Sequence, residues 1–267
     1  MDNINCKIFS ASGNIFTLID NRNINKNTSF FIDNAEILCT YNETQTDGVI
    51  IINNSNKYDF SMVFINPDGT TGMMCGNGGR SAIYYYINSL EKYNENDLIS
   101  FSLNDTNSIY YGSFANNVTS IYFDTPNKID KKEVEVNGIK YSGFFLNNNT
   151  PHFVIELDDV SNFNVKEIGK AIRNDAIFSP EGTNVNFYHK ISSNSIHLRT
   201  YERGVEDETG ACGTGAIATS ISFFSEYGIL GELTIIPTSK SKLYINFAEI
   251  NSTKKIKLTG KVEEIIL

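Results

Sequence analysis

The sequence has 267 residues, a net charge of −9 and an apolar content of 40%, values typical of a globular protein with one large or two medium hydrophobic cores. Its Lys and Arg residues are scattered, so no basic patch indicates a nucleic-acid partner. The first residues lack the basic and apolar regions of a secretory signal, and no apolar run reaches the length of a membrane span. We therefore expect a soluble, cytoplasmic protein with no membrane partner.

The first half of the chain predicts strands joined by tight turns. Apolar runs at residues 47–53 and 58–66 flank the polar stretch NSNK and predict a β-hairpin. Residues 66–72, NPDGTTG, predict a turn. The segment MMCGNGGR follows, and the apolar pattern of residues 81–93 predicts a helix after it.

The second half repeats this plan. Residues 197–203 predict a strand, and residues 204–210, GVEDETG, predict an acidic, solvated turn. ACGTG comes next, and residues 216–230 predict a helix that ends at Gly228 or soon after. The final residues 255–267 predict strands that return to complete a sheet.

The chain thus carries one arrangement twice: strand, turn, Cys-Gly-x-Gly and apolar helix. The two copies are centred on Cys75 and Cys212, about half the chain apart. Two similar domains, each with one cysteine at a helix start, explain this repeat. We expect residues 1–116 with 258–267 to form the domain of Cys75, and residues 117–257 to form the domain of Cys212.

Cysteine at a helix N-terminus is a suitable acid or base. The exposed N–H groups and partial positive charge there stabilise a thiolate and lower its pKa. The adjoining glycines leave the backbone amides open to an anion such as a carboxylate. Two such units acting on one α-carbon would place a thiolate and a thiol on its opposite faces, which is the geometry needed to invert an amino acid.

The same motifs have a plainer interpretation, as glycine-rich turns with buried cysteines. The recurrence of Cys-Gly-x-Gly before an apolar helix favours the chemical interpretation. Cys6 and Cys39 lie in apolar surroundings, so we expect them to be buried and inert. No cysteine lies two to four residues from another, so we expect no metal site.

At these residues the sequence resembles the diaminopimelate epimerase family. The resemblance runs nearly end to end, and its landmarks occur in the family's order. They are SGNIF, FINPDGTTGMMCGNGGR, TPHFVI, GTNVNF and RTYERGVEDETGACGTGA. The two cysteine motifs are specific, whereas the other landmarks gain weight from their order.

The resemblance implies an α/β (α+β) fold of two similar domains, each a curved, mostly antiparallel sheet around a central helix, with the active site in the cleft between them. It implies interconversion of L,L- and meso-diaminopimelate without cofactor or metal, in a homodimer. Cys75 and Cys212 would be the acid/base pair, with His152 and Glu202 helping to set their protonation. The positions matching the family's substrate-binding residues are Asn14, Asn66, Gly76, Asn77, Thr150, Asn184, Glu202, Arg203, Gly213 and Thr214. Arg203 would grip the distal carboxylate, a role that suits its planar fork of donors.

Some positions depart from the family pattern and leave the substrate open. Ile15 stands where Asp commonly follows the Asn, and Asn149 and Thr150 stand where Gly and Asn are frequent. A second hypothesis is therefore the same chemistry on another amino acid, such as histidine or lanthionine. A proline-type racemase is disfavoured, because those enzymes typically carry His where this sequence has Asn77. A third hypothesis, from a different class, is a non-catalytic amino-acid-binding protein.

Overall fold

The computed structural model describes residues 4–71, 74–90, 93–95, 97–104, 108–148, 150–228 and 231–266. The chain forms two compact units: residues 1–123 with 259–267, and residues 124–258. We call them the Cys75 unit and the Cys212 unit. The expected boundary after residue 116 falls too early, because β7 (Val118–Asp124) pairs with β6 (Ile109–Ala115) and stays with the first unit.

The Cys75 unit is a mixed sheet with one long helix. Besides β6 and β7, its strands are β1 (Cys6–Ala11), β2 (Asn14–Asp20), β3 (Gly48–Asn53), β4 (Phe60–Ile65), β5 (Ile99–Leu103) and β17 (Val262–Ile265). Its helices are α1 (Thr28–Asp33), α2 (Ala35–Leu38), the 3-10 turn η1 (Tyr41–Glu43) and α3 (Gly76–Asn88).

The Cys212 unit has a similar composition. Its strands are β8 (Ile129–Val136), β9 (Ile139–Asn147), β10 (Pro151–Glu156), β11 (Asn184–Ser192), β12 (Ser195–Glu202), β13 (Asp207–Thr209), β14 (Leu233–Pro237), β15 (Leu243–Ile250) and β16 (Thr253–Gly260), the last of which runs on into the other unit. Its helices are α4 (Val165–Arg173), the 3-10 turn η2 (Ala176–Phe178) and α5 (Gly213–Tyr227).

The two units share one order of strand pairings. From β1 to β6, successive pairs are antiparallel, parallel, antiparallel, parallel and antiparallel. The series β9, β10, β11, β12, β14 and β15 repeats that order. A parallel pair needs a crossover connection. Helix α3 supplies it between β4 and β5, and α5 supplies it between β12 and β14, which confirms the predicted repeat.

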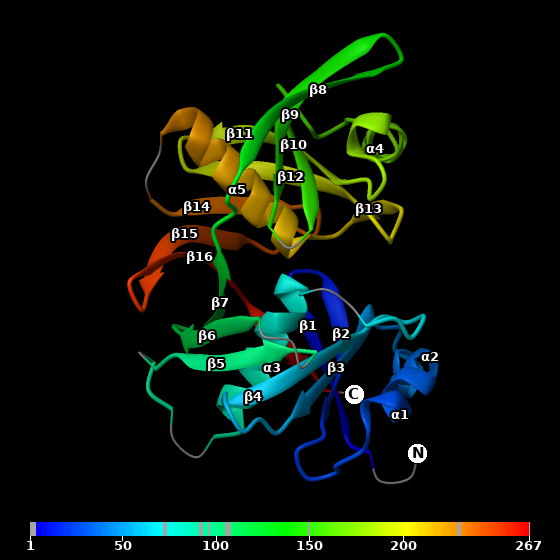
Figure 1. Ribbon diagram of the computed structural model, residues 1–267, viewed down its shortest axis with the longest axis vertical. Coiled ribbons are helices and arrows are strands. Elements are labelled where there is room, and N and C mark those ends of the chain that lie inside the picture. Colours follow the sequence, from blue (N-terminus) through cyan, green and yellow to red (C-terminus); the bar gives the residue numbers. More distant parts are fainter. Residues whose placement is uncertain are drawn as a thin grey trace. The chain divides into compact units, whose positions relative to one another are not determined.

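Each long helix lies inside its own curved sheet (Figure 1). Helix α3 contacts β1, β2, β3, β6 and β17, and α5 contacts β9, β10, β11 and β15. The first turns of both helices are buried, and so is most of α5. The expected α+β architecture of two similar, sheet-rich domains is therefore confirmed.

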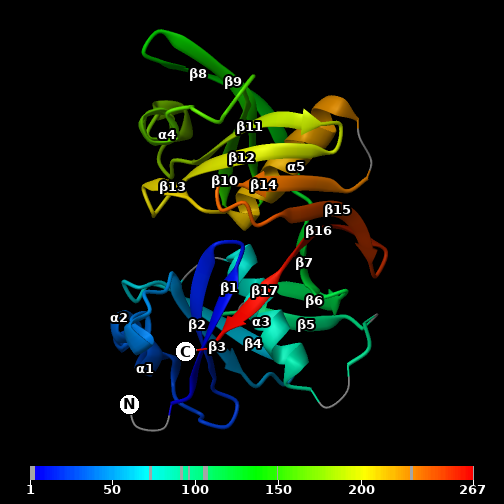
Figure 2. The ribbon, with the colours of Figure 1, turned by 180° about the vertical axis from the view of Figure 1, so that it is seen from behind.

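The predicted elements are present, with shifted boundaries. The hairpin is β3 and β4, and the C-terminal segment returns as β17, which pairs antiparallel with β1 (Figure 2). Both helices begin earlier than their apolar patterns indicated, at Gly76 and Gly213, because burial of the glycine turns outweighs their low helix propensity. Gly228 ends α5 in the left-handed conformation, as predicted.

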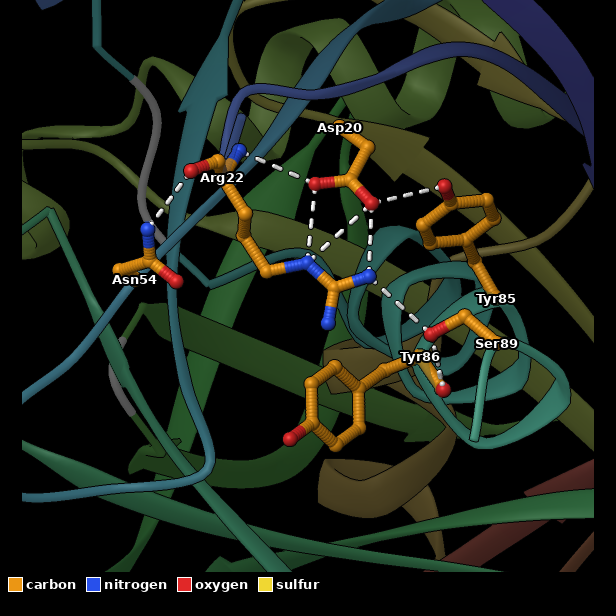
Figure 3. A network of polar contacts seen from close by, with 6 residues as sticks. All are labelled: Asp20, Arg22, Asn54, Tyr85, Tyr86 and Ser89. Atoms are coloured by element: carbon orange, nitrogen blue, oxygen red, sulfur yellow. Dashed lines mark hydrogen bonds and ion pairs between the residues drawn. The ribbon is translucent and has the colours of Figure 1, made fainter. Parts of the chain in front are cut away.

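A polar network holds the C-terminal end of α3 against β2 (Figure 3). Asp20 pairs with Arg22 at 2.6 Å and accepts a 2.9 Å hydrogen bond from the hydroxyl of Tyr85. Arg22 also donates to Ser89 Oγ and lies over the ring of Tyr86. Since this network fixes one end of a rigid helix, it also helps to fix the other end, where Cys75 lies.

No helix in the described ranges is long and apolar enough to cross a membrane.

Candidate active site

Cys75 is the N-cap residue of α3. Its backbone is extended, with φ −90° and ψ 116°, and its Sγ accepts a hydrogen bond from the amide of Gly78 at 3.4 Å. Serine, threonine or aspartate commonly fills this position, and their side-chain oxygen makes the same bond. The sulfur therefore lies at the positive end of the helix, as the sequence predicted, where negative charge on it is favoured.

Cys212 has the same relation to α5. Its φ is −113° and its ψ 113°, and its Sγ accepts from the amide of Gly215 at 3.3 Å. Thr214 Oγ1 lies 3.5 Å from the same sulfur. The two units thus present their cysteines in one local geometry.

Two glycines of these motifs are required by close packing. A Cβ at Gly215 would lie 2.4 Å from Oδ1 of Asn186, and one at Gly79 would lie 2.6 Å from a methyl of Ile121. Any larger residue would push the helix start away from the strands. The glycines therefore set the depth at which each helix begins, and with it the position of each sulfur.

Asn14 and Asn77 lie together beside the start of α3. Nδ2 of Asn77 donates to Oδ1 of Asn14 at 2.7 Å. Asn14 follows the β1–β2 turn, where Ser12 and Gly13 have φ of 55° and 101°, so this tight turn delivers it to the helix. Asp47 accepts from Asn14 Nδ2 at 3.3 Å and from the amide of Ile15 at 2.7 Å.

Arg80 is a residue of this site that the sequence analysis missed. It is fully buried, and burial lowers its pKa from 12.5 to about 10, against the opposing attraction of Cys75. Among the described residues, no carboxylate forms an ion pair with it. The available signal was its spacing, since Arg80 is one helical turn beyond Asn77 and faces the same way.

In the Cys212 unit, His152 lies at the centre of a buried hydrogen-bonded group. Asn186 Nδ2 lies 3.1 Å from His152 Nδ1 and 3.2 Å from the carbonyl of Phe153. Asn186 Oδ1 accepts from Thr200 Oγ1 at 3.0 Å, so both ends of the amide are assigned. Nδ1 must then be the acceptor, and His152 carries its proton on Nε2, which donates to Thr150 Oγ1 at 2.9 Å.

Asn184 ties the end of β12 to β10. Its Oδ1 accepts from the backbone amide of Arg203 at 2.9 Å, and its Nδ2 donates to the carbonyl of Pro151 at 3.0 Å. The Arg203 side chain donates to the carbonyl of Glu181 at 3.1 Å, while Glu202 accepts from Thr209 Oγ1 at 3.0 Å. These bonds bring most of the predicted residues of the second half into one connected region.

The remaining expectations from the sequence concern Asn66, Asn149 and the other two cysteines. The side chain of Asn66 donates to Thr70 Oγ1 within its own turn, and no described hydrogen bond links it to α3. Asn149 lies outside the described residues. Cys6 and Cys39 are buried, as expected, and burial raises both pKa values, that of Cys6 to about 11.

The acidic segment after β12 was predicted to be a solvated turn, and this is wrong in part. Asp207–Thr209 is the short strand β13, and the three carboxylates of this segment all bind cations. The pairs are Glu206 with Arg173, Asp207 with Lys166, and Glu208 with Arg199. The acidic segment alone does not indicate these partners, because they lie outside it, on α4 and β12.

The fold occurs in several solved structures. One is a PhzF-family phenazine biosynthesis protein of Bacillus anthracis, with a TM-score of 0.70 at 13% identity, covering all of both chains. Another is a hydroxyproline epimerase of Agrobacterium vitis, with a TM-score of 0.68 at 9% identity, covering 99% of this chain and 92% of that one.

Relatives of higher sequence identity are named diaminopimelate epimerases. A diaminopimelate epimerase of Aquifex aeolicus is 33% identical over 96% of this chain and 93% of the relative. Another, of Flavobacterium psychrophilum, is 33% identical over 91% of each. The fold and these relatives define the class of protein as an isomerase of the epimerase type. Residues 7–102 and 144–265 match the family described as diaminopimelate epimerase, and the chain belongs to that family.

Proposed function

We propose that this protein interconverts L,L- and meso-diaminopimelate by moving the α-proton between Cys75 and Cys212, without a cofactor. One cysteine, as thiolate, takes the α-proton and becomes a thiol. The other, as thiol, gives its proton to the opposite face of the α-carbon and becomes a thiolate. Before a second turnover in the same direction, the new thiol releases a proton to solvent and the new thiolate takes one up, so protons balance over the cycle.

The observation that carries this proposal is the shared position of the two sulfurs. Cys75 and Cys212 each cap a helix whose first amides can also bind the substrate carboxylate. A carboxylate held there can accept the charge that develops when the α-proton leaves. Gly76, Asn77, Gly213 and Thr214 would make these contacts, and the attraction between Arg80 and Cys75 supports a thiolate at position 75.

Residues of both units would hold the rest of the substrate. Asn14 and Asn66 in the Cys75 unit, and Thr150, Asn184 and Glu202 in the Cys212 unit, carry hydrogen-bonding groups suited to an amino acid. Arg203 is half-buried, and its described side-chain bond to Glu181 uses one of five donors. The others suit the distal carboxylate of diaminopimelate. We expect the enzyme to be a cytoplasmic homodimer.

The first test is deuterium incorporation at the α-carbon. Reduced protein in D2O would be incubated with L,L-diaminopimelate, lanthionine or histidine, and loss of the α-proton signal followed by NMR. Exchange into diaminopimelate supports the proposal, and exchange confined to another amino acid keeps the mechanism but changes the substrate. No exchange into any amino acid would leave the binding-protein hypothesis.

One observation favours a different substrate as the second candidate. Thr150 matches a substrate-contacting position of the family, and its hydroxyl already accepts from His152. A hydroxyl so engaged has one hydrogen to donate, whereas an amide offers a donor and an acceptor together. A substrate without a distal carboxylate should also be insensitive to Arg203→Ala. A large loss of activity in that variant would contradict this candidate.

A further inference from the structure

Four side chains of the Cys75 unit form a continuous chain from a buried cation to a carboxylate. Arg80 Nη2 donates to Asn77 Oδ1 at 2.6 Å, and Asn77 Nδ2 donates to Asn14 Oδ1 at 2.7 Å. Asn14 Nδ2 donates to Asp47 Oδ2 at 3.3 Å. Asn77 is 1% exposed and Arg80 is fully buried, so this chain runs from the interior towards the exposed Asp47.

The charged groups at the two ends of this chain both favour one and the same arrangement of the two amides. A guanidinium can only donate and an ionised carboxylate can only accept. Arg80 therefore obliges Asn77 to present its oxygen inward, and Asp47 obliges Asn14 to present its nitrogen outward. Rotating either amide by 180° would set donor against donor and acceptor against acceptor.

Arg80 also anchors the backbone around this chain. The same Nη2 donates to Ser12 Oγ at 2.9 Å, and Nη1 donates to the carbonyl of Lys261 at 3.3 Å. Ser12 belongs to the turn that precedes Asn14, and Lys261 immediately precedes β17. One guanidinium thus joins the helix start, the β1–β2 turn and the returning C-terminal segment.

We propose that Arg80 and Asp47 are positioning residues that hold the amides of Asn77 and Asn14 in one orientation for the substrate. This inference rests on the proposed function, in which Asn14 and Asn77 contact the reacting amino acid. Asn14 then keeps the second hydrogen of Nδ2 and the second lone pair of Oδ1 for the substrate's polar groups. Charge at both ends of a hydrogen-bonded chain strengthens its inner bonds, so the orientation is fixed before substrate binds.

Asp47→Ala is the variant of choice, because Asp47 is exposed and its loss leaves the core intact. The side-chain amide signals of Asn14 and Asn77 would be followed by 15N NMR in the ligand-free protein, with assignment by Asn14→Ala and Asn77→Ala. We expect both signals to shift, although of these two side-chain amides Asp47 bonds only to that of Asn14. Asp33→Ala removes an equal charge from the exposed surface of α1 and should shift neither.

The second measurement is the steady-state kinetics of the substrate, which is the amino acid into which the wild type incorporates deuterium. Asp47→Ala should lower kcat/KM roughly tenfold, mainly through KM, the factor commonly lost with one hydrogen bond. Asp47→Asn should recover most of this, because a single oxygen, Oδ2, takes both bonds and an amide retains one oxygen. Asp33→Ala should match the wild type.

The outcomes separate this inference from the proposed function. An unchanged Asn77 signal with an unchanged KM in Asp47→Ala overturns the inference. If the wild type exchanges no amino acid but both amide signals shift, the ordered chain stands. Its role towards a substrate, and the proposed function, then fail together.

Discussion

His152 Nδ1 accepts a hydrogen bond from Asn186 Nδ2 at 3.1 Å, and this contact fixes the ring as the tautomer with its proton on Nε2. Burial, together with the positive charge of Arg203, lowers the pKa of His152 from 6.5 to about 3. The ring is therefore neutral near pH 7. It can orient the hydroxyl of Thr150, but it carries no charge with which to stabilise a thiolate.

The neutral ring predicts how stability depends on pH. Between pH 6.5 and 3 the unfolded chain protonates His152 and the folded protein does not, so acid favours unfolding. The stability contributed by the neutral ring is complete above pH 6.5 and falls by up to about 1.4 kcal/mol per pH unit below it. Urea unfolding of wild type and His152→Gln should show a steeper fall for the wild type from pH 6.5 to 5. Parallel curves over that range would contradict it.

Thr150→Val should show how much the hydrogen bond between the Thr150 hydroxyl and His152 contributes to the stability of the protein. The variant leaves the buried Nε2–H without an acceptor, and we expect a loss of about 1–3 kcal/mol in the free energy of unfolding. Thr150→Asn restores an accepting oxygen and adds a donor, so it should be more stable than Thr150→Val. Chemical denaturation of the three proteins gives the comparison, and equal stability of the two variants would count against the hydrogen bond between Thr150 and His152.

Serine at either site cysteine should separate folding from chemistry. Serine is a preferred N-cap, so Cys75→Ser and Cys212→Ser should change stability by less than about 1 kcal/mol. A hydroxyl is a far weaker acid than a thiol, and deuterium incorporation should fall at least about 100-fold.

Cys6→Ser is the matched control for these variants. Cys6 is buried in a β-strand and caps no helix, so serine there should lower stability and leave the exchange rate of the folded protein unchanged. Full exchange in Cys75→Ser or Cys212→Ser would refute the two-thiol mechanism.

Removing Asp20 should loosen the C-terminal anchor of α3. Burial alone would raise the pKa of Asp20, but hydrogen bonds from Arg22 and Tyr85 hold it below its ordinary value. Its stabilising effect should persist above pH 4 and disappear as the pH falls through the lowered pKa. Asp20→Ala should cost about 1–3 kcal/mol at pH 7. Glu264→Ala, which breaks the more exposed pair with Lys7 in the same unit, should change little.

Oxidation offers a separate test of the paired thiols. If Cys75 and Cys212 serve one α-carbon, air oxidation of the empty enzyme should join them and abolish exchange. Dithiothreitol should restore it. Mass spectrometry of the oxidised protein should identify a peptide pair containing both residues, and activity that survives oxidation would contradict the shared site.

Local pattern was sufficient to place Cys75 and Cys212 at helix starts. A cysteine followed by glycines and an apolar helix specifies a helix start by short-range geometry, so this position of both cysteines was predicted correctly. The hairpin of β3 and β4 and the C-terminal return of β17 follow from alternating apolar residues in the same way.

The supporting residues could not be predicted, because their roles depend on contacts between distant segments. Asp47 is important because it binds Asn14, and Asn186 because it binds His152 and lies close to Gly215. These contacts depend on strand register and on the depth of the helix start, and sequence spacing specifies neither. In the sequence Arg80 is an ordinary helix residue, and only the folded chain shows that β17 and the β1–β2 turn enclose it. The cations that pair with Glu206 and Asp207 likewise come from α4.

Because each sulfur caps a helix, any reagent that alkylates it also removes that cap. Covalent modification would free the amides of Gly78 or Gly215 from their acceptor and weaken the first helical turn. Inactivation and local unfolding of the helix start would then be one event. Amide hydrogen exchange at these two glycines would report the occupancy of each thiol independently of any substrate.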